Sequence, residues 1–156
     1  MKRKGPFWDV VNGDSPPSPA ATLLGWTLRA IDPESATIEV GFTLDVRFTN
    51  PAGHIQGGFL AAMLDDTLGP ALVATLDHDQ FAPTASLHVQ FLEPAFPGAY
   101  IGRGRVVRRG ASLAFLAGEL LTESGTAVAT ANATTTIRSI RVDPRARGSV
   151  HNTIGG

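Results

Sequence analysis

Only one segment of this chain, Gly57 to about Leu76, has convincing helical periodicity. Four of its leucines recur every four residues: Leu60, Leu64, Leu68 and Leu72. This spacing places them along one face of a helix. Pro70 should kink or interrupt that helix, because it cannot donate a hydrogen bond to the carbonyl of Asp66. The absence of a second helix to cross between parallel strands predicts an antiparallel sheet.

Alternating hydrophobic and polar residues predict strands on both sides of the helix. Before it, a hairpin is expected from Trp26 onward around a D-P-E-S turn, with Ile38, Val40 and Phe42 sharing one face. The preceding stretch, Asn12 to Pro19, is rich in proline, which forbids regular helix or central strand there. We therefore expect an irregular arm ahead of the first strand.

Period-two alternation returns after the helix. It first places Leu87, Val89 and Phe91 on one face of a strand. Three more strands are predicted: Tyr100 to Val107, Leu113 to Thr122 and Val128 to Ile140. The turns R-R-G-A-S and E-S-G-T, which suit hairpins, separate these three. The whole pattern predicts an α+β fold, in which an antiparallel sheet of about six strands, the last four in a meander, wraps around one long helix.

A chain of 156 residues fits one domain with a real core. We expect an N-terminal arm over residues 1–20, the folded domain over 21–142 and a C-terminal tail over 143–156. A net charge of -1 does not suggest nucleic acid or a membrane surface as a partner. There is no cysteine, no secretory signal and no membrane-spanning run, so a cytoplasmic protein is expected. The histidine spacing predicts no metal site, and no separate cofactor is expected.

The stretch N-P-A-G-H-I-Q-G-G-F-L-A-A-M-L-D-D, Asn50 to Asp66, combines two features that can carry chemistry. A helix that starts at Gly57 leaves its first N–H groups unpaired, which suits an anion or a developing oxyanion. Without Cβ atoms, Gly57 and Gly58 would let a substrate carbonyl approach this backbone. The alternative is that the two glycines only make a tight turn or allow close packing.

The acids at the end of this stretch are about 100° apart around the helix, so they cannot act together as one dyad. Asp65 lies on the side of Leu68 and Leu72, where an unpaired carboxylate calls for a partner or a task. Asp66 is assigned to capping, solvent or subunit contacts. The alternative for Asp65 is a surface acid or one held by structural hydrogen bonds.

The distance between the glycines and the acid adds a constraint. Eight residues at ~1.5 Å rise separate Gly57 from Asp65 by about 12 Å along the helix axis. An aspartate side chain cannot span that gap, so the two can act on one carbonyl only if they come from different chains. A twofold dimer would give two equivalent sites.

These motifs resemble the hotdog-fold acyl-CoA thioesterases of the PaaI type. The similarity runs from N-P-A-G-H-I-Q-G-G-F-L-A-A-M-L-D-D-T-L-G through P-T-A-S-L-H-V-Q-F-L-E-P-A to R-R-G-A-S-L-A-F, and covers roughly residues 23–136. The family's usual pattern is N-x-x-G-x-x-H-G-G, with an acid eight residues after the first glycine and a Ser or Thr on the next strand. The family forms its active site across a dimer interface, and its dimers commonly pair into tetramers.

The resemblance implies roles for individual residues. Asn50 matches the asparagine near the thioester, and the N–H of Gly57 matches the group that polarises the thioester oxygen. Asp65 matches the acid that attacks or activates water, and Thr84 matches the hydroxyl that orients the water. Gln56 stands where the family has histidine; it can help to position the thioester but cannot carry a proton near neutral pH.

Other polar residues are weaker candidates. Arg108, Arg109 and Gly110 match the turn that lies near the coenzyme in the family, so they are expected to contact the nucleotide end of coenzyme A. The alternative, which includes Arg103 and Arg105, is a charged and solvated sheet edge. His54, close to the G-G pair, could stand near the substrate mouth or have no role. Solvent or a subunit contact is expected for His88, and His78 and His151 carry no signal.

The predicted function is hydrolysis of an acyl-CoA thioester to free acid and coenzyme A by a homodimer or a dimer of dimers. One alternative is a hotdog hydratase or dehydratase, although Gln56 removes the histidine that such relatives need. The other is a module that binds acyl-CoA or fatty acid without catalysis. Thiol release from a panel of acyl-CoAs would separate the three.

Overall fold

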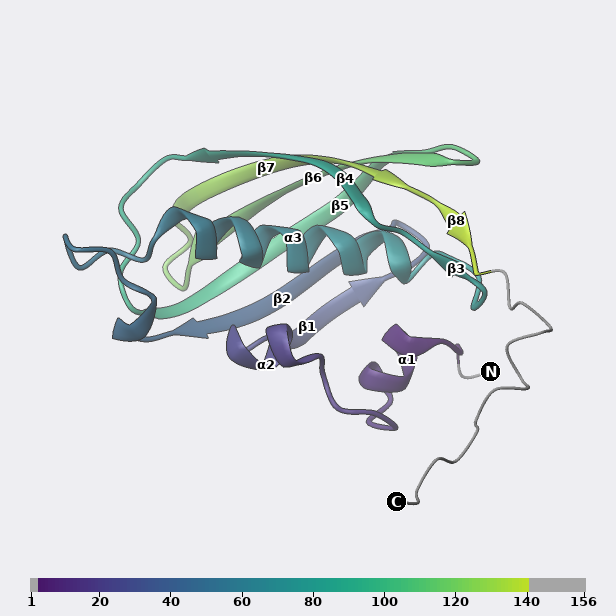
Figure 1. The fold of residues 1–156 in the computed structure, drawn as a ribbon, viewed down its shortest axis with the longest axis horizontal. Helices are drawn as coiled ribbons and strands as arrows, with labels where there is room; N and C mark the ends of the chain where they lie inside the picture. Colours follow the sequence, from purple (N-terminus) through teal and green to yellow (C-terminus); the bar gives the residue numbers. More distant parts are fainter. Residues whose placement is uncertain (1–2, 141–156) are drawn as a thin grey trace, which may run out of the picture.

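The computed structural model describes residues 3–140 (Figure 1). The predicted tail over 143–156 lies outside the described residues. The elements are, in chain order, α1 (Pro6–Val11), α2 (Pro19–Leu23), β1 (Thr27–Asp32), β2 (Thr37–Leu44), the short 3-10 helix η1 (Val46–Phe48), α3 (Gly57–Val73), β3 (Gln80–Phe81), β4 (Thr84–Phe91), β5 (Gly98–Arg109), β6 (Leu113–Thr122), β7 (Ala127–Thr136) and β8 (Arg138–Ser139).

One antiparallel sheet of six strands, in the order β1-β2-β5-β6-β7-β4, curves around α3 (Figure 1). This confirms the predicted fold class. The predicted meander is right for β5, β6 and β7 but wrong for β4, which pairs with β7 at the far edge. Residues 92–97 carry the chain from β4 to β5 across the strand ends, and the N–H groups of Leu92 and Glu93 donate to the Val128 carbonyl of β7. A connection of this length does not force its two strands to be neighbours, as a tight turn would.

The segment ahead of β1 contains two short helices. Asn12 to Ser18 has no helix, as predicted, but α2 begins at Pro19. Proline is tolerated in the first helical position, where its missing N–H would have no partner anyway. The Ser18 hydroxyl oxygen accepts a hydrogen bond from the Ala21 N–H (3.2 Å) and so caps α2.

The core lies between α3 and the concave face of the sheet. All four leucines of the predicted helical face are buried. The helix lies very close to β5 and β6, because a Cβ on Gly102 would come within 2.2 Å of the Thr67 hydroxyl and one on Gly118 within 2.8 Å of Leu68. The glycines of these strands therefore set the distance between helix and sheet.

The helix is not interrupted at Pro70, so the predicted interruption was wrong. α3 continues to Val73. The Asp66 carbonyl, which Pro70 leaves without a helical donor, instead accepts a hydrogen bond from the indole N–H of Trp26 (3.1 Å). A partner supplied from outside the helix thus compensates for the bond that the proline removes. Within residues 3–140, no helix is both long enough and apolar enough to span a membrane.

Candidate functional site

The acid at the middle of α3 meets a hydroxyl from β4. The Thr84 hydroxyl donates to Oδ1 of Asp65 over 2.9 Å, and both residues are exposed. The structure therefore brings together the two residues that the sequence placed on a helix and on the following strand. Because a carboxylate oxygen is free to accept a second hydrogen bond, this pair can bind a water molecule next to the acid.

The structure places Asp65 at the surface, as the alternative interpretation had it, and Asp66 in the more buried position. Asp65 is exposed, whereas Asp66 is half-buried and its Oδ2 has no hydrogen-bond partner among the described residues. Burial, and then the charge of Asp65, raise the pKa of the Asp66 carboxyl to about 6. A helical wheel of α3 alone misses this burial, because it leaves out Trp26, which packs against the same turn from outside the helix.

The start of α3 offers backbone N–H groups that have no hydrogen-bond partner within residues 3–140. The N–H groups of Phe59 and Leu60 reach the carbonyl of Gln56, the residue that precedes the helix. The N–H groups of Gly57 and Gly58 come before this first turn of bonding, and the Gln56 side chain does not cap them. This end of the helix can therefore donate to an oxygen that carries partial negative charge.

A pocket of about 390 Å³ lies beside this helix start. Its lining comes from the loop before α3, from the first turn of α3 and from the end of β4 with the residues after it: Asn50, His54, Ile55, Gly57, Leu60, Phe91, Leu92, Glu93, Pro94 and Ala95. The ring of Phe91 packs directly on Gly57, since a Cβ there would lie 3.0 Å from the ring. An aromatic side chain is therefore part of the wall around the candidate oxyanion site.

Asn50 organises the loop that leads into the helix. Its side-chain oxygen accepts hydrogen bonds from the N–H groups of Ala52 (3.0 Å) and His54 (3.2 Å), and its own N–H donates to the His54 carbonyl (2.7 Å). Asn50 lines the pocket as the resemblance implies, with its amide NH₂ left to meet a ligand. Gln56 is exposed and does not line this pocket.

The three residues expected near coenzyme A lie at the β5–β6 turn. Arg109 donates to the carbonyl (2.7 Å) and hydroxyl (3.1 Å) of Thr75, just past the end of α3, where unpaired carbonyls favour a cation. The Gly110 N–H donates to the Leu113 carbonyl (2.7 Å) and closes the turn. Arg108 is exposed. Arg109 and Gly110 thus have structural roles, although Arg109 is exposed as well.

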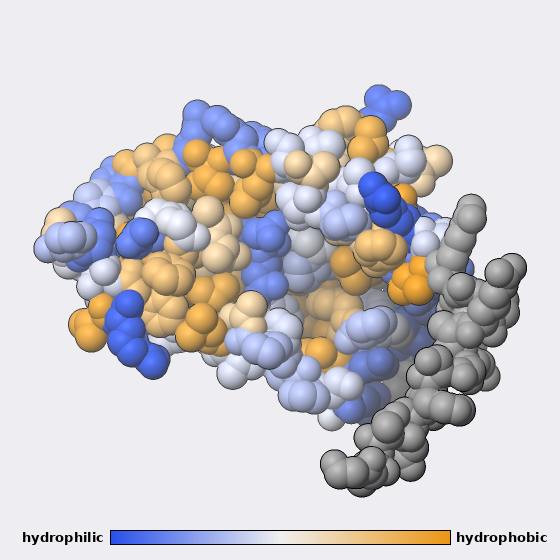
Figure 2. Space-filling model, viewed as in Figure 1, coloured by the Kyte–Doolittle hydropathy of each residue, from blue (hydrophilic) through white to orange (hydrophobic). Residues whose placement is uncertain are grey.

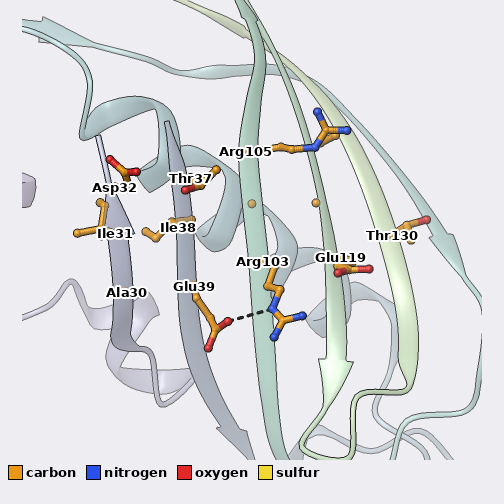
Figure 3. A pocket seen from close by; sticks show the side chains of 13 residues that line it. Ala30, Ile31, Asp32, Thr37, Ile38, Glu39, Arg103, Arg105, Glu119 and Thr130 are labelled. Atoms are coloured by element: carbon orange, nitrogen blue, oxygen red, sulfur yellow. Dashed lines mark hydrogen bonds and ion pairs between the residues drawn. The ribbon is translucent and has the colours of Figure 1, made fainter. Parts of the chain in front are cut away.

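A second pocket, of about 650 Å³, lies on the sheet away from these residues. Figure 3 shows it over β1, β2, β5, β6 and β7, with Arg103 paired to Glu39 across the strands (2.9 Å). Arg105, Glu119 and Thr130 also line it. None of the predicted catalytic residues is there, and its opposite charges lie side by side, so we interpret it as a crease in the solvated face of the sheet.

The face that carries α3 is partly hydrophobic. Figure 2 shows hydrophobic surface gathered over the end of the molecule where α3 begins, next to a hydrophilic band. The exposed large apolar side chains include Phe91, Leu92 and Phe96, which follow one another closely in and after β4. An apolar surface next to an exposed edge strand is typical of a protein interface.

Two contacts near the site were not predicted from the sequence. The first is the bond from Trp26 to the Asp66 carbonyl, for which Pro70 was the available signal, since a proline inside a helix leaves a carbonyl that needs a donor. The second is the packing of Phe91 on Gly57, for which the sequence holds no local signal. Among residues 3–140, no group of three or more potential metal ligands lies close together.

The comparisons with known proteins concern the family and the fold. The thioesterase superfamily profile matches residues 52–129. A protein of Saccharolobus solfataricus, whose name assigns it to the esterases, is 30% identical over 87 residues, 55% of this chain; the match spans 61% of that relative's length.

Solved structures extend the match to the whole fold. A phenylacetic acid degradation-related protein of Ralstonia eutropha JMP134 is 38% identical, with a TM-score of 0.81, over 83% of this chain and 98% of its own. The Escherichia coli PaaI protein, at 18% identity and a TM-score of 0.73 over 83% and 91% of the two chains, shares the fold. The resemblance to hotdog-fold proteins of the PaaI type is thus confirmed, and the chain belongs to the thioesterase superfamily.

Proposed function

We propose that this protein hydrolyses an acyl-CoA thioester to a free acid and coenzyme A, at a site shared by two copies of the chain. Membership of the superfamily supports thioester hydrolysis as the general activity. The observation that carries the proposal is the bond between Thr84 and Asp65, which orients an acid that the single chain leaves exposed. Such an acid is available to a substrate bound by another subunit.

In the proposed reaction, the thioester oxygen lies at the N–H of Gly57. Water attacks the carbonyl carbon while Asp65 takes its proton, and Thr84 orients the carboxylate; direct attack by Asp65 is the covalent variant. One well-placed donor to the developing oxyanion is worth roughly 3 kcal/mol of transition-state stabilisation. Asn50, through its amide, and Gln56 position the thioester.

The shared site follows from the dimensions of α3. Gly57 and Asp65 are two turns apart, about 12 Å along the axis, which exceeds the reach of an aspartate. A twofold pairing along the β4 edge would set the helix start of one chain against Asp65 of the other and would cover exposed Phe91 and Leu92. Two such dimers could then pair into a tetramer. Arg108 is the residue that we expect to contact a phosphate of coenzyme A, on a turn held by Arg109.

The first acyl groups to test are aromatic. Phe91 forms a wall of the pocket at Gly57, and aromatic side chains favour offset or edge contacts with planar groups. The name of the 38% identical relative refers to phenylacetic acid degradation. Phenylacetyl-CoA and its ring-hydroxylated forms therefore belong in the panel beside short and long straight-chain acyl-CoAs.

Thiol release from this panel tests the activity, and mixed dimers test the shared site. Asp65→Asn and Gly57→Val chains should each be nearly inactive. In an equal mixture of coexpressed chains, half of the dimers carry one intact site, so about a quarter of the wild-type sites should return. Asp65→Asn mixed with Thr84→Ala is the matched control, because both changes affect the same half-site and no intact site can form.

The outcomes separate the possible functions. No gain in the first mixture, with dimers present, would show that the site is not shared. A wild-type protein that binds one acyl-CoA tightly and releases no thiol would instead be a binding module. An Asp65→Asn chain with nearly wild-type turnover would remove Asp65 from the mechanism.

A further inference from the structure

His54 is a proton-carrying side chain in the wall of the pocket at Gly57. It is half-buried, and it lines this pocket together with Asn50, Gly57 and Glu93. Gln56, which stands at the family's histidine position, is exposed and outside the lining. The pocket therefore contains an imidazole two residues before the position where the family pattern has one.

The position of His54 is fixed on two sides. The backbone N–H of His54 donates to the side-chain oxygen of Asn50 (3.2 Å), and the backbone carbonyl of His54 accepts from the backbone N–H of Asn50 (2.7 Å). The imidazole packs edge to face on Phe96, with ring centres 4.9 Å apart and the planes at 84°. A loop histidine held in this way keeps one orientation toward the pocket.

Thioester cleavage requires a proton for the leaving sulfur, and neither Gly57 nor Asp65 supplies it in the proposed reaction. When the tetrahedral intermediate collapses, the electron pair of the carbon–sulfur bond goes to sulfur, which becomes a thiolate. The sulfur is bonded to the same carbon as the oxygen at Gly57, so it must lie within the same pocket. The titratable side chains in the lining are Glu93 and His54, and histidine is the residue type that most readily carries and releases a proton at physiological pH.

We infer that His54, as imidazolium, donates a proton to the departing sulfur of the thioester; this inference rests on the proposed hydrolysis. Water forms the new carbon–oxygen bond and gives one proton to Asp65. The carbon–sulfur bond then breaks, and its electron pair takes the proton of His54, which releases coenzyme A as a thiol. The proton on Asp65 returns through solvent to the neutral imidazole, and the carboxylic acid product ionises. Asn50 is a positioning residue, since its oxygen holds the backbone of His54.

The test measures the pH dependence of kcat for wild type and His54→Gln, which keeps a polar side chain but cannot carry the proton. An acid in the mechanism must be protonated, so wild-type kcat should fall as pH rises through the pKa of that acid, and His54→Gln should lose this alkaline limb. At the wild-type optimum, kcat should drop about 30-fold to 100-fold, near the low end for general acid catalysis because thiolates leave readily. KM should change much less.

A change of leaving group separates proton donation from a structural role. With a thioester of the same acyl group and an acidic aryl thiol, the leaving thiolate needs no proton, so His54→Gln should cost less than threefold. Asn50→Ala should lower kcat by a larger factor in wild type than in His54→Gln, where only its proposed contact with the thioester remains to be lost. His88→Gln, a histidine on the exposed face of β4, and Glu93→Gln should both keep the alkaline limb.

An unchanged alkaline limb in His54→Gln, or an equal loss with the aryl thioester, would overturn the inference. In either case hydrolysis that still depends on Asp65 would leave the proposed function intact. If the wild-type protein hydrolyses no acyl-CoA, the proposed function itself fails. Circular dichroism and the elution volume of His54→Gln should match wild type; if they differ, His54→Phe, which keeps the ring contact with Phe96, takes its place in the same measurements.

Discussion

The two ends of the proposed site differ in how completely one chain builds them. At the start of α3, the loop bonds of Asn50, the packing of Phe91 and the free N–H of Gly57 form a pocket within a single chain. At the middle of the helix, Asp65 is exposed, and within residues 3–140 its one side-chain hydrogen-bond partner is Thr84. In the proposed site, one chain therefore forms the half that binds the thioester oxygen, whereas the half that contains Asp65 would be completed by a second copy of the chain.

The same comparison explains why two adjacent acids behave differently. Asp65 is exposed and its carboxylate is hydrogen-bonded, while half-buried Asp66 has a raised pKa and one oxygen with no partner in the described part of the chain. Burying an unpaired carboxylate costs stability. Asp66 therefore affects folding in a pH-dependent way, and Asp65 is available for chemistry.

The largest effect is expected from filling the helix start. Gly57→Val places a side chain where a Cβ already lies 3.0 Å from the ring of Phe91, so the ring must shift and the approach to the N–H is blocked. We expect kcat/KM to fall about 100-fold, comparable to the loss of one oxyanion donor. Gly58→Val is the matched control, because no described atom beyond its chain neighbours and the adjacent helix backbone lies within 4 Å of its Cβ position. Equal losses in both variants would show that the position next to Phe91 is not special.

The next effect separates the two acids by pH. The pKa of Asp66 is raised to about 6, from about 4 when unfolded, so its protonated form favours the native state and this stability is lost as pH rises from 4 through 6. This pKa difference between the native and unfolded states corresponds to about 3 kcal/mol of unfolding free energy. Because Asp66 is partly exposed, we expect about 1.5 kcal/mol. Asp66→Asn should therefore gain that amount over wild type between pH 4 and pH 7.5 in urea unfolding. Asp65→Asn should gain less; a loss of stability in Asp66→Asn at pH 7.5 would contradict the prediction.

Much of the fold and part of the site could be predicted from the sequence. The leucine spacing of α3 and the period-two pattern of its strands depend on local geometry, and they gave the sheet, the helix start at Gly57 and the turn around Gly110. The pairing of Asp65 with Thr84 was predicted from the family pattern, because that pattern combines residues from two different elements.

The parts that could not be predicted depend on contacts between elements. The place of β4 beside β7 is fixed by how residues 92–97 cross the strand ends, not by alternation. The burial of Asp66 depends on what packs against its turn from outside α3, where Trp26 binds the Asp66 carbonyl. The alternation placed Phe91 on one face with Leu87 and Val89, but it did not indicate that Phe91 is 55% exposed and covers Gly57.

A smaller effect is expected from the partner of the acid. Thr84→Ala removes the hydrogen bond to Asp65 and should lower kcat about tenfold, or ~1.4 kcal/mol, because the carboxylate loses one fixed orientation. Thr84→Ser keeps the hydroxyl and should retain most of the activity. If the serine variant is as slow as the alanine variant, the methyl group and not the hydroxyl is what the site needs.

The smallest effect concerns the hydrogen bond from Trp26 to the turn of α3 that contains Asp65 and Asp66, and it does not involve the helix start. Trp26→Phe keeps an aromatic ring but loses the indole N–H to the Asp66 carbonyl, which should cost about 1 kcal/mol of unfolding free energy. Pro70→Ala supplies the helical N–H that this carbonyl lacks, so in that background Trp26→Phe should cost at most half as much. Urea unfolding of the four proteins gives the coupling energy directly. Additive losses of unfolding free energy would mean that the indole stabilises the turn only by packing. A kcat/KM close to wild type in Trp26→Phe would show that Asp65 keeps its role when this hydrogen bond is lost.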